Sequence, residues 1–131
     1  MIRTEKVLVV DVDGTLCPIK PAGQEYRDLP ADPAMKARLA QLRVDGWYIV
    51  LFSSRGMRTY GGDLAAILEH VLPTMVEWLD RHAIAYDEVR MAKPWPGHDG
   101  FYVDDRAVRP REFLTLSLEQ LAERCAADGI A

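Results

Sequence analysis

Short apolar runs separated by helical periodicities make up most of the chain. Residues 7–10 form a continuous apolar run rich in β-branched residues, which predicts a strand buried on both faces and therefore part of a parallel sheet. Residues 47–52 form a second aromatic and β-branched run, which predicts a second strand. Shorter runs at 86–89 and 101–103 predict two more strands.

Helix boundaries are indicated by the residues between these runs. Asp32 and Pro33 predict the N-cap and the first position of a helix, and Gly46 predicts its left-handed end. From 64 to 78 the apolar residues keep a helical spacing through Pro73. This pattern allows either one helix kinked at Pro73 or two consecutive helices with aligned faces.

A capping box predicts the start of the last helix. Ser117 and Gln120 have the spacing at which each side chain bonds the other residue's main-chain N–H. The inward face of this helix is predicted to carry Leu118, Leu121, Ala122 and Cys125, and that of the helix after Pro33 to carry Met35, Leu39 and Leu42.

The order of these elements predicts an α/β fold, a three-layer Rossmann-like arrangement with a mainly parallel sheet and helices on both faces. The 131 residues fit a single domain over residues 1–131, because a second core would lack material. Such sheets bind ligands beyond the carboxyl ends of their strands. Polar residues follow the predicted strands on four segments: Asp11 with Asp13, Ser53, Lys93, and Asp104 with Asp105. We expect them to converge on one edge.

The two aspartates after the first strand predict a catalytic loop. Residues two apart in an extended segment point the same way, so Asp11 and Asp13 reach one site while Val12 faces the core. A hairpin turn at Asp13 and Gly14 is the alternative, but the preceding run does not alternate and no matching strand follows. An EF-hand calcium loop is excluded because it needs Gly at its sixth position, where this chain has Leu16.

Crowded carboxylates indicate a bound cation. The carboxylates expected at this edge are those of Asp11, Asp13, Asp104 and Asp105. Like charges a few ångströms apart repel unless a hard cation neutralises them, and Mg²⁺ takes oxygen ligands of this kind. Lys93, Ser53 and Thr15 add a cation and hydroxyl donors, which are the groups that stabilise a phosphoryl group during transfer. The sequence therefore predicts a magnesium-dependent phosphoryl site.

In these motifs the chain resembles the haloacid dehalogenase (HAD) superfamily of phosphohydrolases, over nearly its whole length. The resemblance is carried by D-x-D-G-T at 11–15, by Ser53 and Asp104–Asp105 at predicted strand ends, and by Lys93. It implies that Asp11 forms an aspartyl-phosphate, and that Asp13 protonates the leaving oxygen and then activates water. It also implies that Ser53 and Lys93 hold the phosphoryl group. The acid at Asp13 favours phosphate esters over carbon–halogen bonds, because an alkoxide leaving group needs a proton.

The same resemblance implies a ligand set for Mg²⁺. Asp11, the main-chain carbonyl of Asp13, and Asp104 are implied to bind the ion directly. Whether Asp105 also binds the ion directly or only contacts the residues that do so is left open.

A finer resemblance is to small bacterial phosphatases associated with capsular polysaccharide synthesis, and it implies a phosphorylated sugar or polyol as the substrate. It is carried by residues 53–60, 78–82, 86–87 and 101–107. Neither the loop at 17–30 nor the stretch after Ser53 is long enough for a separate cap domain, so we expect an open site. Capless relatives accept macromolecular substrates or close their sites as homo-oligomers, and both options remain open.

Further residues near the motifs are candidates for substrate recognition. Ser54, Arg55 and Arg106 are candidates for this role. The two arginines lie nearest the motifs, and their planar guanidinium fork suits phosphate and carboxylate groups. Pairing of each arginine with surplus acids, or exposure to solvent, is the alternative.

Composition narrows the function further. A net charge of −4 weighs against a nucleic-acid partner, and no apolar stretch is long enough to cross a bilayer, so a cytoplasmic protein is expected. Cys17 and Cys125 lack the spacing of a zinc or redox motif and are expected to be buried structural residues. Three hypotheses stand: a phosphatase of small metabolites, a phosphatase of phosphoproteins or nucleic-acid ends, and a catalytically silent scaffold.

Overall fold

The computed structural model describes residues 2–130 and divides them into two compact units, one ending at Trp95 and the other beginning at Pro96. Each unit is described by itself. The single domain over residues 1–131 therefore stays a prediction.

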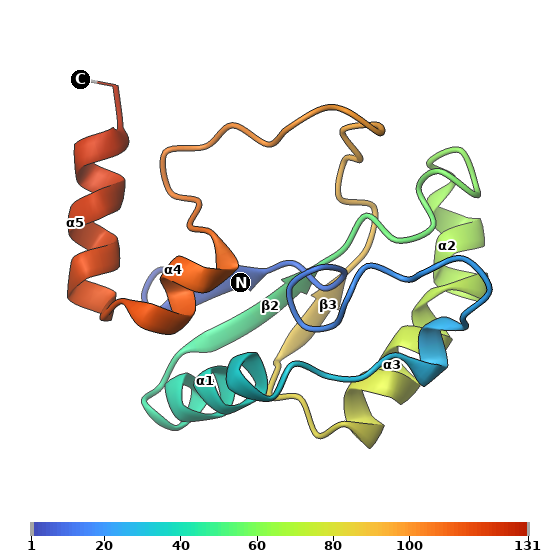
Figure 1. Cartoon of the computed structure of the whole chain (residues 1–131), viewed down its shortest axis with the longest axis horizontal. Helices are drawn as coiled ribbons and strands as arrows, with labels where there is room; N and C mark the ends of the chain where they lie inside the picture. Colours follow the sequence, from blue (N-terminus) through green and yellow to red (C-terminus); the bar gives the residue numbers. More distant parts are fainter. Residues whose placement is uncertain (1, 131) are drawn as a thin grey trace. The chain divides into compact units, whose positions relative to one another are not determined.

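The first unit is an α/β structure built on a three-stranded parallel sheet in the order β1-β2-β3 (Figure 1). Its elements are β1 (Val7–Val10), the 3₁₀ helix η1 (Tyr26–Asp28), α1 (Pro33–Val44), β2 (Tyr48–Phe52), α2 (Leu64–His70), α3 (Leu72–Arg81) and β3 (Glu88–Arg90). In the register, Val10 lies opposite Leu51, and Phe52 opposite Arg90. The predicted α/β class with a parallel sheet is confirmed, and the carboxyl ends of the three strands lie at one edge.

The strand β1 is not buried on both faces. Val9 is 65% exposed, whereas Val10 is buried. Parallel strands in the order β1-β2-β3, joined by right-handed crossovers, are expected to have both helical connections on one face of the sheet. The predicted burial of β1 on both faces is wrong at Val9, and its exposure agrees with helical connections on one face of the sheet.

Helix α1 begins and ends as predicted. The Asp32 carboxylate accepts a hydrogen bond of 2.8 Å from the Met35 N–H, and Pro33 occupies the first turn. Gly46 follows the helix with a φ of 94°, a conformation that glycine adopts without strain. The predicted buried face is confirmed, with Met35, Leu39 and Leu42 at most 2% exposed.

Removing the cap of α1 is expected to destabilise the protein. Asp32→Ala leaves the Met35 N–H without its side-chain acceptor and should lower the free energy of unfolding by about 1 kcal/mol. Urea denaturation measures this change. Asp32→Asn keeps an acceptor oxygen and should stay within a few tenths of a kcal/mol of the wild type; equal losses in both variants would contradict the capping role.

Pro73 separates two helices rather than kinking one. Val71 lies between α2 and α3, and Pro73 stands in the first turn of α3, where a missing N–H breaks no helical hydrogen bond. Ile67, Met75 and Trp78 are nevertheless all buried, at 0%, 0% and 2% exposure. The second of the two alternatives is therefore correct.

The second unit contains α4 (Pro110–Thr115) and α5 (Leu118–Asp128). The capping box of Ser117 and Gln120 is confirmed, and Leu121 is buried. Ala122 is exposed, so its predicted inward position is wrong. Helix α4 has only 6 residues, and no pattern in the sequence predicts it.

The strand predicted at 101–103 does not form. These residues have no regular secondary structure, and Phe101 and Val103 are 86% and 97% exposed. A strand needs a partner for its main-chain hydrogen bonds, and the described part of the second unit contains no other strand. Across residues 2–130, none of the helices has the length and apolar character required to cross a bilayer.

Candidate active site

The loop after β1 is a tight turn held by buried residues. The Gly14 N–H donates to the Cys17 carbonyl at 2.8 Å, and the Leu16 N–H donates to the Val12 carbonyl at 2.8 Å. Val12 and Leu16 are 0% and 1% exposed, so both are fixed in the core. Gly14 has a φ of 87°, which lets the chain reverse directly after Asp13.

Asp11 lies between a hydroxyl and an ammonium group. The Thr15 hydroxyl donates to Asp11 Oδ2 at 3.2 Å, and Lys93 Nζ lies 3.5 Å from Asp11 Oδ1. Burial raises the pKa of the Asp11 carboxyl above its ordinary value, while the charge of Lys93 and the hydrogen bond from Thr15 oppose that rise. These cationic and hydroxyl neighbours favour an ionised Asp11, the form a nucleophile needs.

Main-chain hydrogen bonds place Lys93 beside Ser53. The Ser53 N–H donates to the Arg90 carbonyl at 3.0 Å, and the Lys93 N–H donates to the Ser53 carbonyl at 3.1 Å. This pairing extends the contact of β2 and β3 beyond both strands. Ala92 has a φ of 65°, an uncommon value for alanine, immediately before Lys93.

Asp13 forms an ion pair with Arg55. The Arg55 Nε donates to Asp13 Oδ2 at 3.1 Å, and Nη2 donates to Oδ1 at 2.8 Å. The Arg55 side chain is only 4% exposed, and the main-chain N–H of Arg55 donates to Ser53 Oγ at 3.0 Å. The guanidinium is thus turned toward Asp13 rather than toward solvent.

A close turn after β2 brings Arg55 into this position. The Met57 N–H donates to the Ser54 carbonyl at 3.0 Å, and Gly56 has a φ of 87°. A Cβ on Gly56 would lie 2.8 Å from Val71 Cγ2, so a larger residue here would displace α2 or the turn. Ser54 belongs to this turn, and its predicted contact with substrate stays a prediction.

The first unit brings together residues from three of the four predicted segments. These are Asp11, Asp13, Thr15, Ser53, Arg55 and Lys93. Asp104, Asp105 and Arg106 belong to the second unit, so their part in the site stays a prediction. Within that unit, the Arg106 N–H donates to Asp104 Oδ1 at 2.9 Å, and this bond lowers the pKa of Asp104.

The donor atoms near Asp11 fit magnesium. Among residues 2–130 no three His, Cys, Asp or Glu side chains are grouped as a complete metal site. Mg²⁺ does not require such a group, since it commonly takes one or two carboxylates, several waters and phosphate oxygens. Asp11 supplies a carboxylate, whereas the Asp13 carboxylate is bound by Arg55, which leaves the main-chain oxygen as the ligand that the resemblance implies for Asp13.

Tyr26 also belongs to this site, although it was not predicted from sequence. Its ring centroid lies 4.0 Å from the central guanidinium carbon of Arg55, the distance of a cation–π contact. Burial raises the pKa of the Tyr26 hydroxyl, and the nearby charge of Asp13 adds to the rise. The only signal in the sequence is a single aromatic residue in the loop at 17–30.

Cys17 lies against the same carboxylate, with its Sγ 3.6 Å from Asp13 Oδ1. It is buried, as predicted. Burial, and then the charge of Asp13, raise the pKa of the Cys17 thiol to about 12.

The raised pKa predicts an unreactive thiol. The thiolate is the reactive form, so a thiol that stays protonated below about pH 12 should not react with a disulfide reagent at about pH 8. In a Cys125→Ser variant, Cys17 should therefore label only after unfolding in urea. The prediction is contradicted if Cys17 in the native protein labels as fast as Cys17 in the unfolded control.

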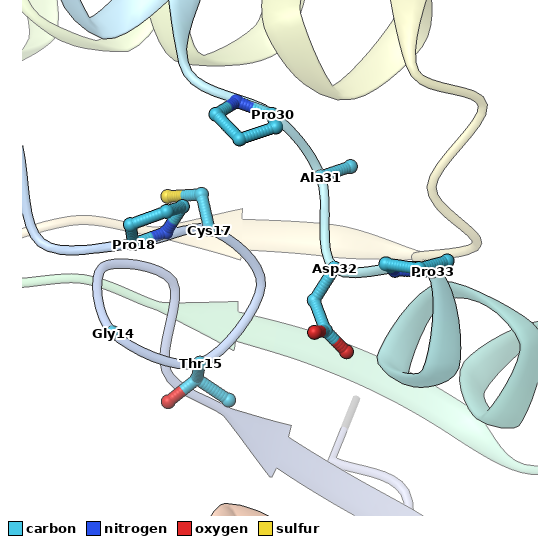
Figure 2. A pocket seen from close by; sticks show the side chains of 8 residues that line it. All are labelled: Gly14, Thr15, Cys17, Pro18, Pro30, Ala31, Asp32 and Pro33. Carbon is cyan, nitrogen blue, oxygen red and sulfur yellow. The ribbon is translucent and has the colours of Figure 1, made fainter.

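A shallow hollow borders the loop after β1, apart from the carboxylates of Asp11 and Asp13. It measures about 390 Å³ and lies between residues 14–18 and residues 30–33 (Figure 2). Its lining includes Thr15 and Asp32, but none of Asp11, Asp13, Ser53 and Lys93. Asp32 is already bound as the cap of α1, so the hollow does not mark the phosphoryl position.

Fold and site together define an α/β protein whose parallel strands end in paired acidic and basic side chains. The chain is similar to an MCSG target from Vibrio cholerae whose crystal structure is known. The two sequences are 42% identical, the match covers 95% of this chain and 99% of that chain, and the TM-score is 0.89. The chain therefore belongs to the same family as this Vibrio cholerae protein.

A second solved structure is more distant. It is the D,D-heptose 1,7-bisphosphate phosphatase from B. bronchiseptica complexed with magnesium and phosphate, at 24% identity and a TM-score of 0.48, covering 73% of this chain and 54% of that chain. A likeness of this degree supports no inference about activity. No protein-family model and no curated protein matches the chain.

Proposed function

We propose that the chain is a magnesium-dependent phosphomonoester hydrolase of the HAD superfamily that acts through an aspartyl-phosphate on Asp11. One observation carries the proposal: the Asp11 carboxylate lies directly after β1, bonded to Thr15 and paired with Lys93. A solvated surface aspartate has no need of such neighbours. The D-x-D-G-T motif that follows β1 supports the same assignment.

In the first step, an Asp11 oxygen attacks phosphorus and the bond from phosphorus to the leaving oxygen breaks. Lys93 and Ser53 bind the phosphoryl oxygens, and Asp13, which enters this step as the neutral acid, gives its proton to the leaving oxygen and becomes a carboxylate. Bound Mg²⁺, held by Asp11 and the Asp13 main chain, would offset the negative charges of nucleophile and phosphoryl group.

In the second step, water attacks the phosphorus of the aspartyl-phosphate. Asp13, now a carboxylate, takes a proton from this water. The bond from phosphorus to the Asp11 oxygen breaks, phosphate leaves, and Asp11 returns to its starting form.

The substrate that we propose is a sugar phosphate or a similar small phosphorylated metabolite. The net charge of −4 disfavours a nucleic-acid substrate. The resemblance to phosphatases of capsular polysaccharide synthesis favours a sugar or polyol. Asp104 and Asp105 are proposed as further magnesium ligands, and Arg106 as a substrate contact.

Phosphate release from a panel of compounds tests this function. The panel contains sugar phosphates, nucleotides, phosphopeptides and oligonucleotides with terminal phosphates, each with Mg²⁺ and with a chelator. Mg²⁺-dependent release that is fastest for sugar phosphates would support the proposal. Faster release from phosphopeptides or oligonucleotide ends would overturn the substrate class, and no release from any compound would overturn the phosphatase assignment.

A further inference from the structure

Both oxygens of the Asp13 carboxylate are bound by one guanidinium. Arg55 Nε and Nη2 donate to different oxygens, at 3.1 and 2.8 Å, and Cys17 Sγ lies 3.6 Å from Oδ1. A forked guanidinium fixes the plane of a carboxylate as well as its distance, which a lysine ammonium does not. The rotation of the Asp13 side chain is therefore set by Arg55.

Arg55 is itself held on several sides. Its side chain is 4% exposed, compared with 22% for Asp13. The Tyr26 ring packs 4.0 Å from the guanidinium carbon, and the Arg55 N–H is bonded to Ser53 Oγ. In this position Asp13 retains access to solvent and Arg55 does not, so Arg55 is poorly placed to take an anion from solution.

The loop that carries Tyr26 is anchored to the first unit at its far end. Leu29, just after η1, is 2% exposed, and its carbonyl accepts a hydrogen bond of 2.8 Å from Trp78 Nε1 of α3. Arg81 of α3 also donates to the Arg27 carbonyl. The contact of Tyr26 with Arg55 is thus supported by a fixed loop.

From this geometry we infer that Arg55 and Tyr26 are positioning residues for Asp13, orienting the carboxyl group that gives a proton to the leaving oxygen and then, as the carboxylate, takes one from water. The inference rests on the proposed function and assigns Arg55 a role different from the direct phosphate contact predicted from sequence. Tyr26 packs Arg55 against Asp13, and Arg55 sets the angle of the carboxylate. Neither residue touches the phosphoryl group.

Leaving groups of different basicity separate this role from substrate binding. An alkyl phosphate needs a proton on its leaving oxygen, whereas 4-nitrophenyl phosphate expels a stable phenolate and needs little help. Arg55→Met should therefore lower kcat for an alkyl phosphate by about tenfold to a hundredfold, with little change in KM. The same variant should lower kcat for 4-nitrophenyl phosphate by less than about threefold.

Tyr26 provides a matched pair of variants with no change in charge. Tyr26→Phe keeps the ring on Arg55 and should behave as wild type, whereas Tyr26→Leu should reproduce the selective loss for alkyl phosphates. In an Asp13→Asn background, Arg55→Met should have little further effect, because the residue that it positions is already absent. The Tyr26 pair keeps the inference testable even if Arg55→Met fails to fold.

Four results would overturn the inference. A raised KM with unchanged kcat in Arg55→Met would assign Arg55 to substrate binding. Equal losses for both leaving groups, accompanied by lower thermal stability, would assign a purely structural role. If the wild type releases phosphate in an Mg²⁺-dependent reaction and all Arg55 and Tyr26 variants release it at the same rate, the positioning role alone is overturned. If the wild type releases no phosphate, the proposed function is overturned along with it.

Discussion

Replacing Asp11 with asparagine is expected to reduce phosphate release on the order of 10⁴-fold or more, as is typical when a covalent nucleophile is removed. The amide keeps the size of the side chain and can still contact the Thr15 hydroxyl, which bonds Asp11 at 3.2 Å in the wild type. It cannot attack phosphorus, and it lacks the charge that pairs with Lys93. The loss should therefore appear in kcat for every substrate, and steady-state phosphate release measures it.

A second aspartate provides the control for the loss of charge. Asp45 is an exposed residue at the end of α1, and Asp45→Asn removes one negative charge outside the site. This variant should keep wild-type activity. If Asp11→Asn retained more than about a tenth of the wild-type rate, Asp11 would not be the nucleophile.

Replacing Trp78 with alanine is expected to destabilise the first unit by about 3 to 5 kcal/mol. Trp78 is 2% exposed, so its removal leaves a large cavity beside α3. It also leaves the Leu29 carbonyl without the Nε1 donor that binds it at 2.8 Å. The urea concentration at the unfolding midpoint measures the change.

Trp78→Phe separates packing from hydrogen bonding. Phenylalanine fills most of the volume but has no N–H for Leu29, so a smaller loss of about 1 to 3 kcal/mol is expected. A loss below about 1 kcal/mol in Trp78→Ala would contradict the central place of Trp78 in the core.

The parts of the fold that follow from local chemistry could be predicted from sequence. Asp32, Pro33 and Gly46 act within one or two turns of chain, and the helix between them begins and ends where they predict. The meeting of Asp11 and Lys93 was predictable as well, because parallel strands end at the same edge of a sheet.

Features that depend on partners distant in sequence could not be predicted in this way. Residues 101–103 have the composition of a strand, but a strand also needs a neighbouring strand, and the second unit has none among its described residues. The Arg55 pair with Asp13 depends on side-chain rotamers across two loops, and sequence spacing does not determine these. Tyr26 joins that pair through a loop with no periodic pattern.

The measurement that tests the central claim most directly is covalent trapping of the phosphoryl group on Asp11. Wild-type protein is mixed with a turned-over substrate and Mg²⁺, quenched in acid within one turnover, digested, and analysed by mass spectrometry. The account predicts a phosphorylated peptide modified at Asp11, which is absent with chelator and absent in Asp11→Asn. Continued phosphate release with no modified Asp11, undiminished in Asp11→Asn, would contradict it.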